Sequence, residues 1–323
     1  MTRKFITLLI ALTTWSCASP DPNRIQLILD WKAQMEHAGF FVAVHNGFYT
    51  EEGIEIEILE GNGAPTAARV VGNGTYKLGV ASGSATVMAR AKNIPIVSLA
   101  VINQHTPVVV YSLKEKNITK PNDLIGKKIG VNVGGTKHRE FQALLRKSNI
   151  PEDQIQLMGM SEASPAPLLA GQVDAMLGYT EDQPVTVELT GREVNRLALA
   201  DYGISVYSTN IIANESFLKE NPDLVHKFMR ATLRGWRYAV AHSDEAVAAY
   251  MAKRPESDEA FNRANFNHLI PLLKSSDTEK QGLGAQTEEK WTHTQDILHS
   301  LGMIDQKVEI NELFTNAYLS STP

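Results

Sequence analysis

The sequence is poor in reactive side chains: it has one cysteine, Cys17, among 323 residues. A lone cysteine near the N-terminus leaves the rest of the chain without a disulfide, a thiolate nucleophile or a cysteine-based metal site. The nine histidines are scattered without ligand-like spacing, and the HExxH, GxSxG and Walker patterns are missing. We therefore expect neither a catalytic set nor a cofactor or metal site, and the protein is predicted not to be an enzyme.

Clusters of positive charge are also lacking, and the net charge is −5 at pH 7. A basic patch is the footprint of a nucleic-acid-binding protein, so no nucleic-acid partner is expected. After the first residues, no apolar run is long enough to span a bilayer. Membrane contact is therefore expected only through a lipid anchor, if at all.

The N-terminus has the pattern of a secretory signal peptide, predicted over residues 1–17. Arg3 and Lys4 precede a short apolar run at 5–12, and small or polar residues follow. Two exits are possible: Cys17 becomes an acylated N-terminus, as in a bacterial lipoprotein, or cleavage follows Ala18. Either exit predicts an exported protein, in the periplasm or on the outer face of the cytoplasmic membrane.

After residue 23, short apolar strands alternate with helical patterns, which predicts an α/β fold with a mostly parallel core. The segments 64–82 and 164–180 share a proline-started helix, a glycine turn and a short strand, which indicates two similar units. The chain is expected to leave the first unit near residue 111 and return near 207. This predicts one lobe from 24–111 plus 208–323, another from 112–207, and a ligand cleft between them.

The most informative local feature is Asp30-Trp31, directly after the apolar strand that ends at Leu29. Ligands of α/β proteins bind at the carboxyl ends of strands, and an indole ring there offers a stacking surface. In the other predicted lobe, Tyr179 ends a strand and Glu181 and Asp182 follow it. We expect the two aromatic rings to sandwich a flat ligand and an acid to accept its ring N–H groups; a rim tryptophan and a solvated acidic loop are the structural alternatives.

Further candidate ligand-binding residues are small or aromatic. Ser82 and Ser84 offer hydroxyl and N–H groups after a strand. Gly135 and Thr136 stand between a strand and a helix, where N–H groups attract anions, although an ordinary tight turn is an equal alternative. Tyr202 and Tyr207 lie near the return crossing, and hinge packing is the alternative for both.

The segment "LDWKAQMEHAGFFVAVHNGFYTEEGIEIEI" resembles the opening of ABC-transporter solute-binding proteins, in the family that includes binders of the thiamine pyrimidine precursor and alkanesulfonate or taurine binders. His37 matches a histidine of this pattern. Further matches are "GVASGS", "DLIGKKIGVNVGG", "LLAGQVDAMLGYTEDQP" and "NESFLKENPDLVHKFMRATLRGW", in order along the chain.

The resemblance implies a monomeric, two-lobed, hinge-closing periplasmic-binding-protein fold that serves an ABC permease. The expected ligand is a flat nitrogen heterocycle, first of all the thiamine pyrimidine precursor, with a flavin-like aromatic compound or a sulfonate as alternatives. The residues after Trp31 and the "EDQP" segment depart from the pyrimidine binders, which leaves the exact ligand open. Fungal relatives that synthesise the pyrimidine are the enzymatic alternative, but the cysteine-rich segment of those proteins has no counterpart here.

Overall fold

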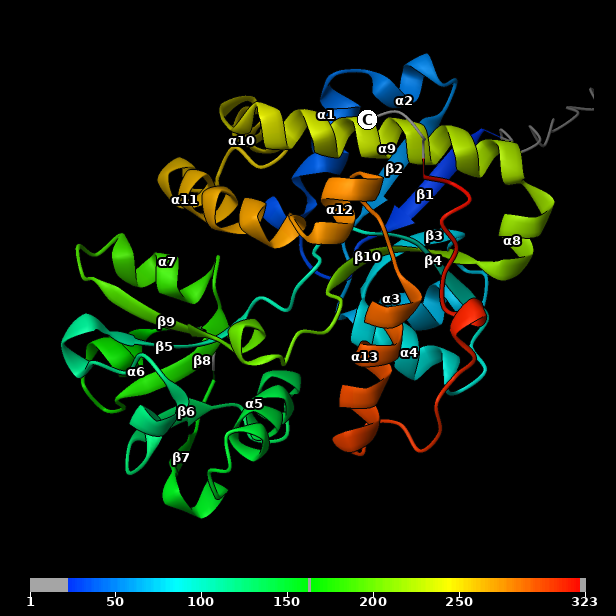
Figure 1. Ribbon diagram of the computed structural model, residues 1–323. Coiled ribbons are helices and arrows are strands. Elements are labelled where there is room, and N and C mark those ends of the chain that lie inside the picture. Colours follow the sequence, from blue (N-terminus) through cyan, green and yellow to red (C-terminus); the bar gives the residue numbers. More distant parts are fainter. Residues whose placement is uncertain (1–22, 162–163, 320–323) are drawn as a thin grey trace, which may run out of the picture.

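The computed structural model describes residues 23–161 and 164–319 (Figure 1). The predicted signal peptide and Cys17 lie outside these residues. Within the described part, no helix combines the length and the apolar character needed to cross a membrane. The strands form two five-stranded sheets, each covered by helices, as the α/β pattern predicts.

The first sheet has the order β2-β1-β3-β10-β4. Its strands are β1 (Arg24–Ile28), β2 (Glu55–Leu59), β3 (Leu78–Ser82), β4 (Ile96–Val101) and β10 (Thr209–Asn214). The second sheet has the order β7-β6-β8-β5-β9. Its strands are β5 (Val108–Leu113), β6 (Lys128–Val131), β7 (Gln156–Gly159), β8 (Ala175–Tyr179) and β9 (Val194–Ala198). We call the parts built on them the first and second lobes.

The two sheets have the same topology. The triplets β2-β1-β3 and β7-β6-β8 are parallel, and one antiparallel strand, β10 or β5, follows each triplet. The sequence echo between 64–82 and 164–180 thus falls on β3 and β8, which occupy equivalent positions. In each sheet the antiparallel strand is the first one after the chain has crossed from the other lobe.

The first crossing lies earlier than the sequence indicates. The sequence predicts that residues 108–111 belong to the first lobe, but β5 pairs with β8 and β9 of the second sheet. The apolar composition of β5 shows that the strand is buried and does not show which sheet buries it. The return crossing precedes β10, near the expected position.

Helices of the first lobe include the C-terminal part of the chain (Figure 1). They are α1 (Ala38–His45), α2 (Phe48–Glu51), α3 (Ala64–Gly72), α4 (Gly83–Arg90), α8 (Glu215–Glu220), α9 (Pro222–Ala241), α10 (Ser243–Met251), α11 (Glu259–Leu269), α12 (Ser276–Gln281) and α13 (Glu288–Ser300). The second lobe carries α5 (Thr136–Lys147), α6 (Ala166–Leu169) and α7 (Gln183–Glu188). In Figure 1, α11 lies over α7, where the lobes meet.

The core of the first lobe fixes the segment that follows β1. Trp236 of α9 is fully buried and packs edge-on against Phe40 of α1, with ring centroids 6.0 Å apart. A Cβ atom at Gly39 would lie 2.2 Å from the Trp236 ring, so only glycine permits this approach. The close packing of α1 and α9 holds the connection from β1 to α1, which carries several of the predicted site residues.

Candidate ligand-binding site

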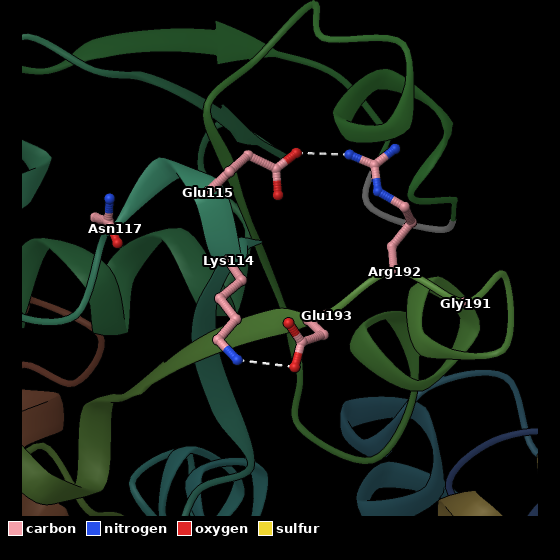
Figure 2. Close-up of a pocket in the computed structure, with 6 residues that line it drawn as sticks. All are labelled: Lys114, Glu115, Asn117, Gly191, Arg192 and Glu193. Carbon is pink, nitrogen blue, oxygen red and sulfur yellow. Dashed lines mark hydrogen bonds and ion pairs between the residues drawn. The ribbon is translucent and has the colours of Figure 1, made fainter.

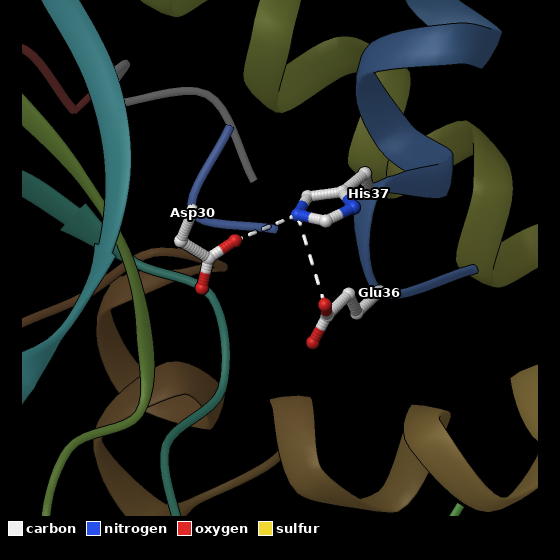
Figure 3. A group of neighbouring side chains, drawn as sticks. All are labelled: Asp30, Glu36 and His37. Carbon is white, nitrogen blue, oxygen red and sulfur yellow. Dashed lines mark hydrogen bonds and ion pairs between the residues drawn. The ribbon is translucent and has the colours of Figure 1, made fainter. Parts of the chain in front are cut away.

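The wall contributed by the first lobe begins where β1 ends. The carbonyl of Asp30 accepts the N–H of Gly63 (2.6 Å), and that of Trp31 accepts the N–H of Gly61 (3.0 Å). The short 3₁₀ turn η1 (Met35–His37) then brings His37 back to Asp30, with 2.9 Å between Nε2 and Oδ1. Glu36 Oε1 lies 3.8 Å from the same nitrogen (Figure 3). This compact loop gathers two carboxylates around one buried imidazole.

The ring nitrogens of His37 have distinct partners. The backbone N–H of Gln34 donates to Nδ1 (3.3 Å), which leaves Nε2 as the proton-bearing nitrogen of the neutral ring and the donor to Asp30. Ligand atoms of Asp30, Glu36 and His37 lie within 4.8 Å of one another, a spacing compatible with a metal ion. A metal-binding nitrogen presents a lone pair, however, so a proton on Nε2 favours a hydrogen-bonded pair over a metal centre.

Electrostatics within this group shift two pKa values. Burial raises the pKa of Glu36 to about 7, and the negative charges of Asp30 and Asp182 add to the effect, while His37 opposes it. Burial alone lowers the pKa of His37, but its hydrogen bond to Asp30 and the nearby carboxylates raise it more, so the net shift is upward. Helix α11 contacts both η1 of the first lobe and α7 of the second, which brings the two walls near each other.

The wall from the second lobe begins where β8 ends. Gln183 ties this turn together: its Oε1 accepts the N–H of Tyr179 (3.0 Å), and its Nε2 donates to Asp182 (2.7 Å). The ammonium group of Lys137, in the first turn of α5, lies 4.1 Å from the centroid of the Tyr179 ring. In this arrangement a cation covers the ring face that the sequence analysis assigned to ligand stacking.

Glu181 is the most unusual group of this wall. Only 5% of the residue is exposed, and its Oε2 atom has no hydrogen-bond partner. Burial raises the pKa of the Glu181 carboxyl to about 8, and the nearby carboxylates of Glu36 and Asp182 also raise it, whereas a backbone hydrogen bond and Lys137 lower it. A buried acid without a full set of partners is costly, which makes this atom a candidate for ligand contact.

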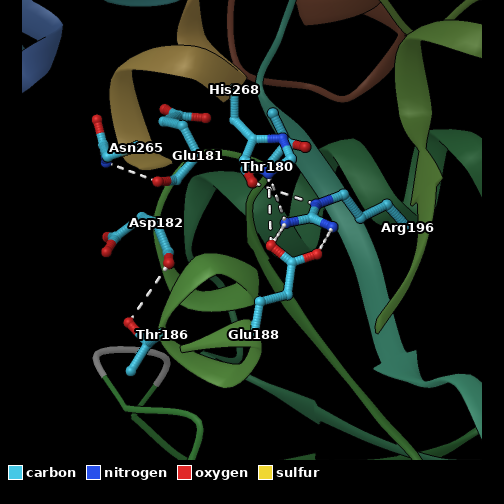
Figure 4. A network of polar contacts seen from close by, with 8 residues as sticks. All are labelled: Thr180, Glu181, Asp182, Thr186, Glu188, Arg196, Asn265 and His268. Atoms are coloured by element: carbon cyan, nitrogen blue, oxygen red, sulfur yellow. Dashed lines mark hydrogen bonds and ion pairs between the residues drawn. The ribbon is translucent and has the colours of Figure 1, made fainter. Parts of the chain in front are cut away.

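Helix α11 joins the two walls. The side-chain nitrogen of Asn265 donates to the backbone carbonyl of Glu181 (2.6 Å), and the side-chain oxygen of Asn265 is itself buried without a partner. One turn along the helix, His268 Nε2 lies 3.4 Å from Glu188 Oε2, and Glu188 forms a two-pronged ion pair with Arg196 (2.5 and 2.8 Å; Figure 4). These contacts hold the first lobe against the turn that carries Glu181.

Five of the predicted site residues belong to the two walls described above: Asp30 and His37 in the first lobe, and Tyr179, Glu181 and Asp182 in the second. Trp31 follows the end of β1, and 47% of its surface is exposed. The role of each as a ligand contact stays a prediction.

The remaining predicted residues are placed less directly. The hydroxyl of Ser82 caps α4 by accepting the N–H of Ala85 (3.1 Å), and Ser84 is buried in the first turn of that helix. Gly135 and Thr136 begin α5, but the preceding N–H of Gly134 is already bonded to His138 (3.0 Å). One N–H group of this turn is thus already paired, and the role of Gly135 and Thr136 in anion binding stays a prediction.

The two tyrosines near the return crossing serve packing in this structure. Tyr202 packs against the core of the second lobe. Tyr207 is fully buried, its ring meets Trp291 edge-on at 5.1 Å, and its hydroxyl accepts the N–H of Thr287 (3.1 Å). The ring of Tyr207 is thus part of the buried core, which agrees with the packing alternative.

Sequence reasoning missed Glu36, Lys137, Glu140 and Asn265. Glu140 of α5 is buried, and burial raises its pKa to about 7, while the Thr106 hydroxyl that donates to it (2.7 Å) and Lys137 oppose this shift. Glu36 lies between Trp31 and His37, and the sequence pattern points to those two residues and not to Glu36. Asn265 has no local signal, because only the docking of α11 on the second lobe brings it to Glu181.

A depression of about 480 Å³ lies at the other end of the second sheet (Figure 2). Its charged groups pair with each other: Lys114 with Glu193 (2.8 Å) and Arg192 with Glu115 (2.6 Å). Leu113 pairs with Val194 at this end of β5, whereas Val108 pairs with Tyr179 at the other. Because its charges are matched and it is remote from the interlobe space, the candidate site is the one between the lobes.

The fold is that of the two-lobed periplasmic binding proteins. The aliphatic sulphonate-binding protein SsuA of Escherichia coli superposes with a TM-score of 0.71 at 16% identity, over 90% of this chain and 92% of that one. Residues 34–246 match the model of the NMT1/THI5-like family, and the chain belongs to this family.

Three relatives of similar sequence carry names that range from binding proteins to a synthase. The riboflavin-binding protein RibY of Chloroflexus aurantiacus is 26% identical over 311 residues, which cover 94% of this chain and 88% of that protein. The formylaminopyrimidine-binding protein of Halalkalibacterium halodurans is 24% identical over 323 residues, covering 97% and 98%. A 4-amino-5-hydroxymethyl-2-methylpyrimidine phosphate synthase of Legionella pneumophila is 26% identical over 305 residues, covering 93% and 94%.

Proposed function

We propose that this protein is the extracytoplasmic solute-binding component of an ABC importer and that it captures a flat nitrogen heterocycle between its lobes. The observation that carries the proposal is the buried Glu181, whose Oε2 has no partner and which stands across from Glu36 of the first lobe. The exposed ring of Trp31 at the end of β1 supplies a stacking surface on the first lobe.

A thiamine pyrimidine precursor is the ligand we place first. An aminopyrimidine combines stacking faces with ring nitrogens and an exocyclic amine, which suit an indole ring and a carboxyl group. The relative that binds formylaminopyrimidine supports this choice, and the relative RibY supports a flavin-like ligand as the second candidate. A sulfonate fits less well, because the negative charges of Asp30 and Asp182 would oppose an anion.

Delivery of the ligand requires a permease and a location outside the cytoplasm. We propose that the protein acts as a monomer, either free in the periplasm or anchored through Cys17. The relative named as a formylaminopyrimidine-binding protein and the periplasmic sulphonate-binding structural neighbour support this assignment.

The proposal is tested by the mass of whatever compound co-purifies with the full chain from rich medium. Titration calorimetry then compares 4-amino-5-hydroxymethyl-2-methylpyrimidine, formylaminopyrimidine, riboflavin and an alkanesulfonate. We expect one of the heterocycles to bind and the sulfonate not to bind. Binding of the sulfonate alone would contradict the proposal.

Relatives named as pyrimidine phosphate synthases make catalysis the second candidate. The two functions separate in one assay, because a synthase releases a pyrimidine phosphate and a binding protein returns its ligand unchanged. We expect mass spectrometry of the ligand after prolonged incubation with the protein to show it unchanged, with no new pyrimidine phosphate.

A further inference from the structure

The ligand class follows from the chemistry that Glu181 offers. We propose that Glu181 binds its ligand as a neutral carboxylic acid, which pairs its O–H and its carbonyl with an acceptor–donor edge of an uncharged heterocycle. This inference rests on the proposed function and narrows it: the ligand presents a ring nitrogen or carbonyl directly beside an N–H group. Amino-substituted pyrimidines and the imide edge of a flavin both have such an edge.

Burial of the Glu181 side chain is the first argument. Only 5% of the residue is exposed, and its carboxyl oxygen Oε2 lacks a hydrogen-bond partner. A charged carboxylate in such a place needs several donors, and the described contacts do not supply them for Oε2. A neutral acid has a lower desolvation cost and needs only one acceptor and one donor.

The charges around Glu181 supply the second argument. Glu36 approaches from η1, Asp182 is adjacent in the same turn, and Lys137 comes from α5. Two of these three neighbours are acids and favour the protonated form, whereas Lys137 and a backbone hydrogen bond of Glu181 favour the ionised form. The direction of the shift in the Glu181 pKa agrees with this geometry.

Asn265 extends the same recognition surface. Its side-chain nitrogen donates to the backbone carbonyl of Glu181, and its side-chain oxygen is a second buried acceptor without a partner. In Figure 4 the carboxyl group of Glu181 and the side chain of Asn265 extend to the same side of their shared hydrogen bond. An amino group of the ligand has two N–H donors. One can donate to the carbonyl oxygen of the Glu181 side chain and the other to the side-chain oxygen of Asn265.

The pairing excludes two ligand classes. An anion such as a sulfonate offers acceptors but no donor for the Glu181 carbonyl or Asn265. A permanent cation without an acceptor leaves the Glu181 O–H unpaired or forces it to lose its proton. The acid therefore selects uncharged edges that both donate and accept.

The test uses the full chain, with 4-amino-5-hydroxymethyl-2-methylpyrimidine and riboflavin as probes in titration calorimetry from pH 7 to 9.5. For the probe that binds, affinity is constant below the pKa of about 8 and then falls as Glu181 loses its proton. The expected loss is about tenfold per pH unit, or roughly 30-fold by pH 9.5. Glu36→Gln removes a neighbouring negative charge, so the decline begins at lower pH, whereas Glu193→Gln in the remote depression leaves the profile unchanged.

Two variants at position 181 complete the test. Glu181→Leu removes both hydrogen bonds and weakens binding by about 30- to 300-fold at pH 7. Glu181→Gln keeps one donor and one acceptor, so it restores most of that loss and removes the decline above pH 8. The wild-type profile and the glutamine variant do not depend on whether the leucine variant folds.

The outcomes separate the two claims. If neither probe binds the wild-type chain, the proposed function fails and this inference fails with it. If a probe binds but its affinity is flat or rises with pH, or Glu181→Gln is as weak as Glu181→Leu, Glu181 acts as a charged acceptor. The neutral-acid inference is then wrong, while the proposed function stands.

Discussion

At the scale of single residues, Trp31 is the sharpest test of the candidate site. Its ring is 47% exposed, so Trp31→Ala removes little core packing, and the melting temperature should change by no more than about 2 °C. If the ring stacks on the ligand, the same change weakens binding by about 2–4 kcal/mol, or roughly 30- to 1,000-fold. Trp31→Phe should recover part of the loss. Calorimetry and thermal melts on the same samples give both quantities.

Trp236 provides the matched control for Trp31. It is fully buried between α1 and α9, so Trp236→Ala should cost roughly 3–5 kcal/mol of folding free energy. Any variant that stays folded should bind the ligand nearly normally. If Trp31→Ala instead lowers the melting temperature sharply and keeps its affinity within about twofold, the ring covers core and is not a ligand surface.

The Asp30–His37 pair predicts a pH-dependent stability. Because the pKa of His37 in the folded protein is raised above 6.5, the pairing stabilises the fold fully below that value. The contribution is lost as the pH rises through the folded-state pKa. Asp30→Asn should therefore lower the melting temperature more at pH 6 than at pH 9, as measured by calorimetric scans. An equal effect at both values would show that the imidazole does not gain a proton from this pairing.

The site residues near Asp30 could be predicted from the sequence because they follow a strand directly. Asp30-Trp31 and Tyr179 to Asp182 both stand where an apolar strand ends, and strand ends are where α/β proteins gather their ligands. Tyr207 has the same aromatic character, but its burial against Trp291 depends on the position of α13. Local pattern finds the ends of strands, and only tertiary packing decides which aromatic ring stays at the surface.

At the scale of elements, the strands of each sheet were predictable from their apolar runs, but their partners were not. β5 has the composition of a buried strand, and either sheet could accommodate it. Its antiparallel pairing with β8 places the first crossing before Val108. The contact between α11 and the β8–α7 turn joins segments more than 80 residues apart and leaves no periodic signal.

The contact between His268 of α11 and Glu188 of α7 is predicted to affect ligand affinity, although neither side chain is expected to touch the ligand. His268 lies 3.4 Å from Glu188 across the lobes, and burial, followed by the charge of Arg196, lowers the pKa of His268. The pair is partly exposed and the ring is mainly neutral at pH 7, so the contact contributes little. His268→Ala should weaken binding by up to about fivefold through a less favourable closed form.

The exposed His299 in the last turn of α13 is the matched control for His268. His299→Ala should leave affinity and melting temperature unchanged. If His268→Ala binds as tightly as the control, the α11 contact does not bias closure. Both variants are measured by calorimetry at pH 7, with thermal melts on the same samples.

At the scale of the whole molecule, the two crossings form a narrow hinge. The N–H of Ser208 donates to Asn103 (3.1 Å) and the N–H of Asn103 to Thr209 (3.2 Å), so the outgoing and returning segments lie side by side. His105 Nδ1 and the Ser205 hydroxyl, 3.0 Å apart, also link them. Few residues need to change their backbone angles for one lobe to rotate against the other, which is the usual basis of hinge closure.

Ligand capture should therefore change the overall dimensions. A compact chain of this length has a radius of gyration of roughly 20 Å, and an open two-lobed form exceeds it. Small-angle scattering should show the radius falling toward that value when the heterocycle that binds is added at saturation. Trp31→Ala, measured at the same ligand concentration, should stay open because its site is mostly empty. An unchanged radius for the saturated wild-type protein would mean that the lobes do not close on the ligand. Helix α11 would then bury Glu181 in the empty protein and in the ligand-bound protein alike.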